Sequence, residues 1–347
     1  MKLRSDRFSP WIYGLFAAIS AAALCACVCI GSVSVPLRDT LAVTGEAIRA
    51  LLRQEPLPTG LTAAIILSIR IPRVLCVALT GAALSLAGAA MQGLLKNPLA
   101  DGSTLGVSSG AALGAVAAIA FGLRFPLLPF AGTAVMAILF AFLSLLFILA
   151  LAYKLDYSLS TNTIILIGVI FSMFASSLMS LIMTFASDKI QQITFWTMGS
   201  LQGKSYADAG FLLGALLLFG GVLLLHAREL NAFALGEDNA RNIGVNVQRV
   251  RLTVLIAVSG LIGVCVSVGG TIGFVGLVTP HMARMLVGPN HQRLLPASLF
   301  GGALFLMLAD LVARILLDPI ELPIGVVTSL VGAAVFVVIF YRSRKGG

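Results

Sequence analysis

Residues 126–153 read PLLPFAGTAVMAILFAFLSLLFILALAY and carry no charged side chain. A helix needs roughly 20 mostly apolar residues to cross the hydrocarbon core of a bilayer, so this stretch is long enough to span a membrane. Similar runs recur from one end of the chain to the other. Together they predict about ten membrane-spanning helices, at residues 11–30, 71–91, 105–121, 126–153, 161–186, 209–225, 252–268, 271–287, 294–317 and 322–341.

The composition also indicates a membrane protein built of helices. Hydrophobic residues make up 59% of the chain and charged residues 11%, whereas a soluble domain carries about 25% charged residues. A transmembrane β-barrel would show alternating polarity in segments of about ten residues, but these apolar runs are continuous. We therefore predict an all-α integral membrane protein.

The polar connections restrict what the chain can form outside the membrane. The longest are residues 32–68, 187–208 and 226–251, and none is long enough for a nucleotide-binding domain. A single membrane domain over residues 1–347 is therefore expected. A basic start followed by an apolar run has the form of a signal peptide, but the run at 11–30 is long enough to remain as a first membrane helix.

The net charge of +9 would suggest nucleic-acid binding in a soluble protein. In a membrane protein, basic residues gather in cytoplasmic loops, and we expect both termini on the cytoplasmic side. Five arginines run against this bias, because they fall on segments expected outside: Arg38, Arg49, Arg53, Arg70 and Arg73.

Two groups of residues resemble nucleotide-binding or metal-binding motifs, but neither has the required spacing. Residues 199–205, GSLQGKS, are similar to a phosphate-binding loop but have three residues between the glycines, where that motif has four. His226, His281 and His291 are not spaced like metal ligands. We expect no catalytic residue, metal site or cofactor in this chain, so ATP and its Mg²⁺ would be bound by another chain.

Polar residues at membrane depth are costly and often functional. Asp310 and Arg314 lie four apart and share a helix face, which is compatible with either a structural ion pair or a functional role. Pro280 lies inside an apolar run and should break or kink its helix. A turn is expected after the second helix, at three residues: Asn97, Pro98 and Asp101.

Residues 230–244, LNAFALGEDNARNIG, are too polar to span the membrane. Leu235, Asn239 and Ile243 recur at helical spacing, with Gly236 and Gly244 marking the ends of a short helix. We expect this helix on the cytoplasmic surface. It either docks a soluble partner or is an ordinary amphipathic surface helix.

Taken in order, several short motifs resemble one family, the FecCD-type permeases of ABC importers for iron siderophores, haem and vitamin B12. The motifs read RIPR at 70–73, GAAL at 81–84, GAAMQ at 88–92, NPLAD at 97–101, LGVSSGA at 105–111, WTMGS at 196–200, ALGE at 234–237, GFVGLVTPH at 273–281 and ELPIG at 321–325. Gly102 and Ala334 stand where the family usually has proline, which bears on the shape of the last helix.

This resemblance implies the type II architecture of ABC importer permeases. It implies a homodimer with the substrate passage on its two-fold axis, two ATPase subunits below and a substrate-binding protein above. By similarity, the ATPase-docking residues are Ala234, Leu235, Gly236, Glu237, Asn239, Ala240, Arg241 and Gly244. The cytoplasmic gate is Leu159, Ser160 and Thr161, and the binding protein docks on Arg70, Arg73 and Arg314, whose guanidinium groups suit carboxylate partners. The expected structural positions are Asn97, Pro98, Asp101, Pro280, Asp310, Glu321 and Pro323.

The sequence thus predicts a permease subunit of the bacterial inner membrane that imports an iron chelate. A ferric siderophore is the first choice, with haem or cobalamin as alternatives. An ion-coupled transporter would place ionisable groups at the membrane midplane, but the acidic residues here lie mainly near helix ends. A membrane enzyme or scaffold would need a polar catalytic cluster or a large extramembrane domain, and the sequence shows neither.

Overall fold

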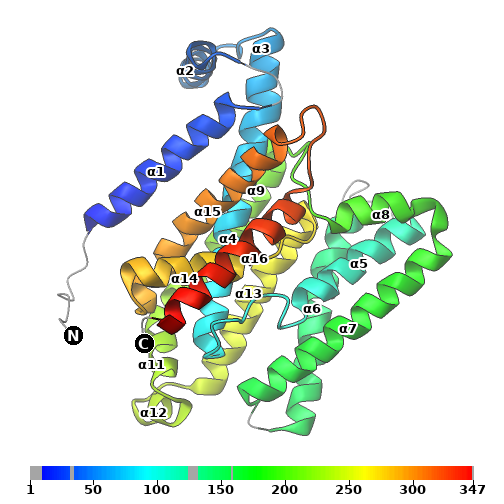
Figure 1. The fold of residues 1–347 in the computed structure, drawn as a ribbon, viewed down its shortest axis with the longest axis vertical. Coiled ribbons are helices and arrows are strands. Elements are labelled where there is room, and N and C mark those ends of the chain that lie inside the picture. Colours follow the sequence, from blue (N-terminus) through cyan, green and yellow to red (C-terminus); the bar gives the residue numbers. More distant parts are fainter. Residues whose placement is uncertain (1–9, 32–34, 124–131, 158, 346–347) are drawn as a thin grey trace.

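The computed structural model describes residues 10–31, 35–123, 132–157 and 159–345, and within them every element is helical apart from an isolated bridge between Leu317 and Ile320 (Figure 1). The elements are α1 (Pro10–Cys29), α2 (Leu37–Arg53), α3 (Leu61–Ala64), η1 (Ile65–Arg70), α4 (Ile71–Leu94), α5 (Val107–Phe121), α6 (Gly132–Leu155), α7 (Thr161–Phe185), η2 (Ser187–Lys189), α8 (Ile190–Thr197), α9 (Tyr206–Ala215), η3 (Leu216–Gly220), α10 (Gly221–Leu225), α11 (Ala227–Ala234), α12 (Glu237–Asn242), α13 (Val247–Gly269), α14 (Val275–Val287), α15 (His291–Ile315) and α16 (Ile324–Lys345).

The all-α membrane fold is confirmed. In the described part of the chain, 7 helices are long and apolar enough to cross a membrane, judged by length and composition: Trp11–Cys29, Leu61–Leu94, Gly132–Leu155, Thr161–Phe185, Tyr206–Leu225, Val247–Gly269 and His291–Ile315. The other three predicted runs correspond to α5, α14 and α16, and both α5 and the apolar part of α16, Ile324–Ile339, are shorter than the seven spans. Residues 126–131 of the fourth predicted run lie outside the described residues.

Helix α4 lies at the centre of the molecule. α4 packs against α15, α13 and α14, while α5 packs against α6 and α7 to one side (Figure 1). α1 lies along α15. α2 and α3 lie at one end of the bundle and α12 at the other (Figure 1), and these are called the α2 end and the α12 end below.

The second membrane helix is longer than its apolar run predicts, because it begins at Leu61 rather than at residue 71. Proline lacks an N–H and clashes with the preceding turn of an α-helix. Pro72 is nevertheless accommodated near the start of α4, and the turn before it, η1, is a π-helix. Such wider turns commonly absorb an irregularity inside a continuous helix.

Pro280 does not break its helix, contrary to the stronger form of the prediction. α14 continues from Val275 to Val287. A proline leaves the carbonyl four residues earlier without its helical donor. Here the side-chain amide of Gln92, on α4, donates to the carbonyl oxygens of Gly276 and Leu277 at 3.3 Å each. The polar backbone exposed by Pro280 is thus satisfied inside the protein, as a lipid environment demands.

α2 was not expected, since residues 32–68 read as a polar connection. One face of α2 is buried through Thr40, Ala47 and Ala50. A second face exposes apolar side chains and is flanked by exposed arginines. The apolar residues are Leu37, Leu41, Ile48 and Leu52, and the arginines are Arg38, Arg49 and Arg53. This is the pattern of a helix that lies in the interface between membrane and water.

We expect the apolar face of α2 to contact lipid. A nitroxide spin label at Leu41→Cys, in a variant without the native cysteines, should collide more often with oxygen than with a water-soluble nickel chelate in lipid nanodiscs. A label at Glu46→Cys, on the charged side of the same helix, should show the reverse. Equal accessibility profiles at the two positions would contradict a lipid-facing α2.

Glycines let α4 and α15 approach closely. A methyl group added at Gly302 would collide with the backbone carbonyl of Gly81, while one added at the neighbouring Gly301 would meet nothing within 4 Å. Close backbone approach through small residues is the usual basis of helix packing in membranes.

Gly302→Ala should therefore lower the free energy of unfolding by about 1–3 kcal/mol, the cost typical of overpacking. Gly301→Ala, the matched control, should change it by less than about 0.5 kcal/mol. Unfolding in mixed detergent micelles measures both values. Equal effects of the two substitutions would mean that α4 and α15 are not packed this closely.

Candidate functional site

The expected ATPase-docking segment lies at the α12 end as two helices joined by a turn. α11 ends at Ala234, and α12 runs from Glu237 to Asn242. Gly236 and Gly244, on either side of α12, have φ of 110° and 91°, a conformation that glycine adopts without the cost of a side chain. The predicted glycine boundaries are therefore confirmed as the ends of a short helix.

The side chains of this segment divide into anchors and exposed groups. Ala240 is fully buried, and the Asn239 amide donates to the carbonyl of Leu235 at 2.7 Å. Leu235 and Ile243 lie just outside α12 and are 66% and 64% exposed. Arg241 is half exposed beside Glu237 and Asp238. The segment therefore presents two apolar side chains around a charged turn.

The expected gate, Leu159 to Thr161, forms the turn between α6 and α7. Thr161 begins α7. The carboxylate of Asp156 accepts from the Ser160 N–H and from the Thr163 hydroxyl, both at 3.2 Å, and the Ser160 and Thr163 hydroxyls lie 2.9 Å apart. Leu159 has φ of 52°, which is unfavourable for a residue with a side chain. Local hydrogen bonds therefore hold an unusual turn.

Arg251 connects these two places, and sequence reasoning did not single it out. It lies on α13 and is 1% exposed. Its guanidinium forms a hydrogen-bonded ion pair with Glu237 and donates to the carbonyl oxygen of Leu159 at 2.8 Å. The only sequence signal was a basic residue, Arg251, next to the apolar run that begins at residue 252.

The arginines expected at a docking surface form a buried network at the α2 end. Arg73 donates to Asp310 at 2.9 Å and to Glu321 at 2.7 Å, and Arg314 lies 3.0 Å from Asp310. The predicted pairing of Asp310 with Arg314 is thus confirmed. The network extends across α4, α15 and the turn before α16, where Pro323 precedes the first helical residue.

The same arginines also close the end of α1. Arg70 donates to the carbonyls of Val28 and Cys29 at 2.9 and 2.8 Å, and Arg314 donates to those of Cys27 and Ile30 at 3.0 and 3.1 Å. The last carbonyls of a helix lack donors and attract cations. These two arginines therefore supply donors that α1 itself cannot provide.

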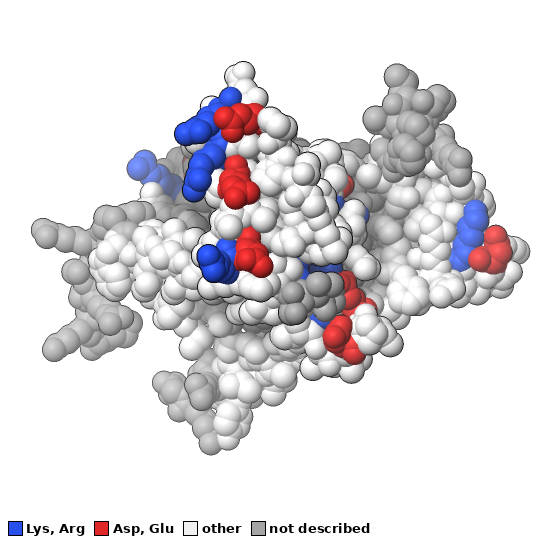
Figure 2. All heavy atoms as spheres, turned by 90° about the horizontal axis from the view of Figure 1, so that it is seen from above, with Lys and Arg blue, Asp and Glu red and all other residues white. Residues whose placement is uncertain are grey.

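Arg70, Arg73 and Arg314 are buried in the chain rather than exposed on a docking surface, and their role in docking stays a prediction. Their exposed fractions are 5%, 7% and 3%, because each guanidinium is packed between helices and bonded to groups of the same chain. Figure 2 shows the α2 end, where charged side chains gather over α2 and at the opposite rim while most of the face is uncharged. A charge reversal at Arg70 and Arg73 would therefore disturb the fold as well as any docking.

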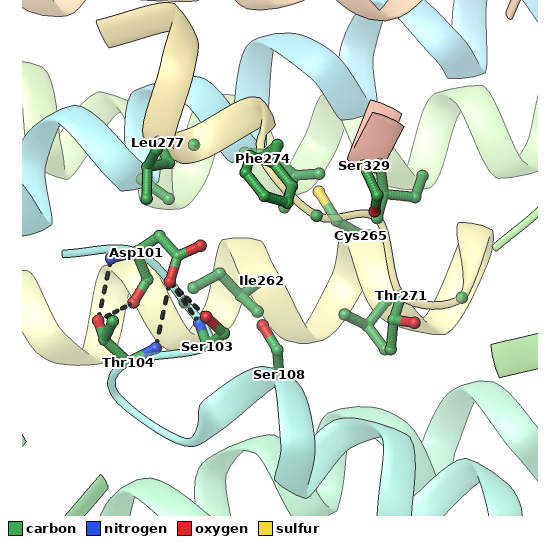
Figure 3. Close-up of a pocket in the computed structure, with 18 of the residues that line it drawn as sticks. Asp101, Ser103, Thr104, Ser108, Ile262, Cys265, Thr271, Phe274, Leu277 and Ser329 are labelled. Atoms are coloured by element: carbon green, nitrogen blue, oxygen red, sulfur yellow. Dashed lines mark hydrogen bonds between the residues drawn. The ribbon is translucent and has the colours of Figure 1, made fainter. Parts of the chain in front are cut away.

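A cavity of about 290 Å³ lies between the turn after α4, the segment before α14 and α16. Asp101, Ser103, Thr104, Ser108 and Ser329 contribute polar groups to it (Figure 3). One oxygen of the Asp101 carboxylate accepts from the N–H groups of Ser103 and Thr104 at 3.0 and 3.1 Å. The predicted turn at Asn97, Pro98 and Asp101 is thus present, and Asn97 accepts from the Leu99 N–H at 2.9 Å.

Comparison with known proteins shows the family to which the chain belongs. The model of the FecCD transport family matches residues 19–342. The uncharacterized ABC transporter permease protein YvrB of Bacillus subtilis is 42% identical over 353 residues, covering 100% of this chain and 97% of its own. The molybdate import system permease protein MolB of Haemophilus influenzae is 38% identical and covers 82% of both chains. Other matched relatives are named for hemin and vitamin B12 import.

A solved structure agrees over nearly the whole fold. It is described as an inward-facing conformation of a metal-chelate type ABC transporter and is 33% identical, with a TM-score of 0.83 over 96% of this chain and 100% of that one. The fold is therefore that of a membrane-spanning ABC importer permease. The chain belongs to the FecCD transport family.

Breaking the network at the α2 end should destabilise the fold. Removing one member of a buried ion pair costs about 3–5 kcal/mol, so Arg73→Met should lower the free energy of unfolding by about that amount. Arg38→Met, which removes an exposed arginine from α2, should change it by less than about 0.5 kcal/mol. Equal and small effects in mixed-micelle unfolding would mean that the network does not hold the helices together.

Proposed function

We propose that this chain is the transport subunit of an ATP-driven importer for an iron chelate, a ferric siderophore in the first instance. It acts as a homodimer with two ATPase subunits and a substrate-binding protein. ATP hydrolysis belongs to the ATPase subunits, so the chain itself catalyses no reaction. The α12 end faces the cytoplasm, with both termini on that side, and the α2 end faces outward.

The observation that carries the proposal is the short α12 segment with Leu235 and Ile243 exposed on either side. An ordinary surface helix keeps its apolar side chains against the protein. Here two large apolar side chains are exposed outside the predicted membrane helices, and both lie in the segment that similarity to the FecCD family assigns to ATPase docking. A soluble ATPase subunit is the partner that this surface supports in a member of the FecCD family.

The mechanism follows from the two ends of the molecule. ATP-driven closure of the ATPase pair displaces α12, and the helices of the bundle carry that displacement toward the α6–α7 turn. Leu159, Ser160 and Thr161 then open or close the cytoplasmic side of the passage. At the other end, a loaded binding protein docks on the α2 end, whose surface is held in place by the network of Arg73, Asp310 and their neighbours.

The network also favours ATP over an ion gradient as the energy source. Ion-coupled transporters use ionisable groups near the midplane that gain and lose a cation. Asp310 is an acidic residue inside a membrane helix, and its carboxylate is paired with both Arg73 and Arg314. Both contacts bind Asp310 to arginines of the same chain, so its carboxylate holds helices together rather than a transported ion.

The substrate proposal is supported by the metal-chelate type of the solved relative, with hemin and vitamin B12 import named among other relatives. Uptake of labelled ferric siderophore, hemin, cobalamin and molybdate should be compared between a strain without this gene and its complemented counterpart. Ferric siderophore uptake should depend on both the gene and ATP. Uptake of none of these compounds, or uptake that follows the proton gradient, would refute the proposal.

The α12 segment should bind the ATPase subunits through its exposed apolar residues. Leu235→Asp with Ile243→Asp should remove most of the ATPase that copurifies with the chain, because both side chains would lose buried contacts in the complex. The matched control is Leu57→Asp, which changes an exposed leucine between α2 and α3 at the opposite end. Copurification unchanged in the double variant would show that the ATPase docks elsewhere.

A further inference from the structure

Arg251 is a charged side chain with almost no contact with solvent. It is 1% exposed, and it is the largest fully buried side chain among the described residues. Burying a guanidinium is costly unless it is paired and hydrogen-bonded. If Arg251 served only to fill space, an apolar residue would do so without the cost of burying a charge. Its contacts therefore indicate what Arg251 does.

Those contacts lie on two segments that are far apart in the sequence. One nitrogen of the guanidinium is bonded to Glu237, the first residue of α12, and another donates to the carbonyl of Leu159, 92 positions before Arg251 in the chain. The planar fork of arginine can hold two acceptors at once. Arg251 therefore joins α12 to the α6–α7 turn through one rigid group.

The two ends of this link differ in how they are held. Glu237 begins a helix of six residues that rests on α11 and α13, so a force on α12 acts on Glu237 directly. At the other end, Leu159 is held in a left-handed conformation by its own N–H bond to the Asp156 carbonyl at 2.9 Å and by the bond from Arg251. An unfavourable conformation held by a distant residue can relax when that residue moves.

We infer that Arg251 transmits the movement of α12 to the α6–α7 turn. This inference rests on the proposed function, since it takes α12 as the ATPase-docking segment and the turn as the gate. When α12 shifts, Glu237 draws the guanidinium with it, and the bond to the Leu159 carbonyl is lengthened or lost. Leu159 and Ser160 then leave their present conformation. Arg251 is a positioning residue, because it reaches neither the substrate nor ATP.

The test uses the full transporter, with its ATPase subunits and binding protein, in proteoliposomes. Arg251→Met should lower uptake per ATP hydrolysed by about tenfold, in the range typical of a lost coupling between two sites. Its basal ATP hydrolysis and its copurified ATPase should stay at the wild-type level. Arg249→Met is the matched control, because it removes an exposed arginine two positions away on the same helix, and it should leave coupling unchanged.

A second pair of measurements separates transmission from folding. Arg251→Met leaves Glu237 without its buried partner, so the double variant Arg251→Met with Glu237→Gln should restore stability but not coupling. A spin label at Ser160→Cys, in a variant without the native cysteines, should change mobility on ATP addition and should no longer do so when Arg251→Met is added. Arg251→Lys, which can reach one acceptor well but not both, should couple at an intermediate level.

Two results would overturn the inference. One is uptake per ATP hydrolysed that equals the wild-type value in Arg251→Met or in the double variant. The other is loss of the ATPase subunits from Arg251→Met and the double variant, which would make Arg251 part of the docking surface rather than a transmitter. Failure of the proposed function looks different, because the wild-type transporter would then show no ATP-dependent uptake, or its ATPase would not bind at α12.

Discussion

The polar groups of this chain must find their partners inside the protein, because lipid offers none. At Pro280 and at the end of α1, backbone carbonyls that would be left without a donor are met by side chains from another helix. Gln92 supplies donors to the carbonyls exposed by Pro280, and Arg70 supplies donors to the end of α1. The helices are therefore held together by polar contacts at their irregular points and by apolar packing between those points.

These polar contacts are unevenly distributed, and the distribution separates rigid parts from movable ones. At the α2 end, Asp310 is shared by Arg73 and Arg314, and Glu321 ties the start of α16 to the same group. A network in which each member has several partners resists the movement of any one. At the α12 end, Arg251 pairs with Glu237 and donates to the backbone carbonyl of Leu159. One guanidinium there joins α12 to the turn between α6 and α7, which suits a region that has to pass on movement.

The sequence predicted the features that depend only on residues close together along one helix. Apolar runs located the membrane helices, glycines marked the ends of α12, and a spacing of four placed Asp310 beside Arg314. Contacts between helices could not be predicted in the same way. Arg73 lies 237 positions from Asp310, and Gln92 lies 184 positions from Gly276. Helical periodicity says which face a residue occupies and nothing about which helix packs on it.

That difference explains why the burial of the outer arginines was not foreseen. Arg70 and Arg73 were assigned to a docking surface by similarity to the family, and their place on segments expected outside the membrane agreed with that assignment. Their partners, the carbonyls at the end of α1 and the carboxylates of Asp310 and Glu321, are contributed by distant parts of the chain. A buried arginine and an exposed one look alike in sequence. Arg251 and Arg249 make the same point two residues apart, since one is buried against two segments and the other is exposed. The burial of a charge, which only the fold reveals, is therefore what distinguishes an arginine that links helices from one that merely balances charge at the surface.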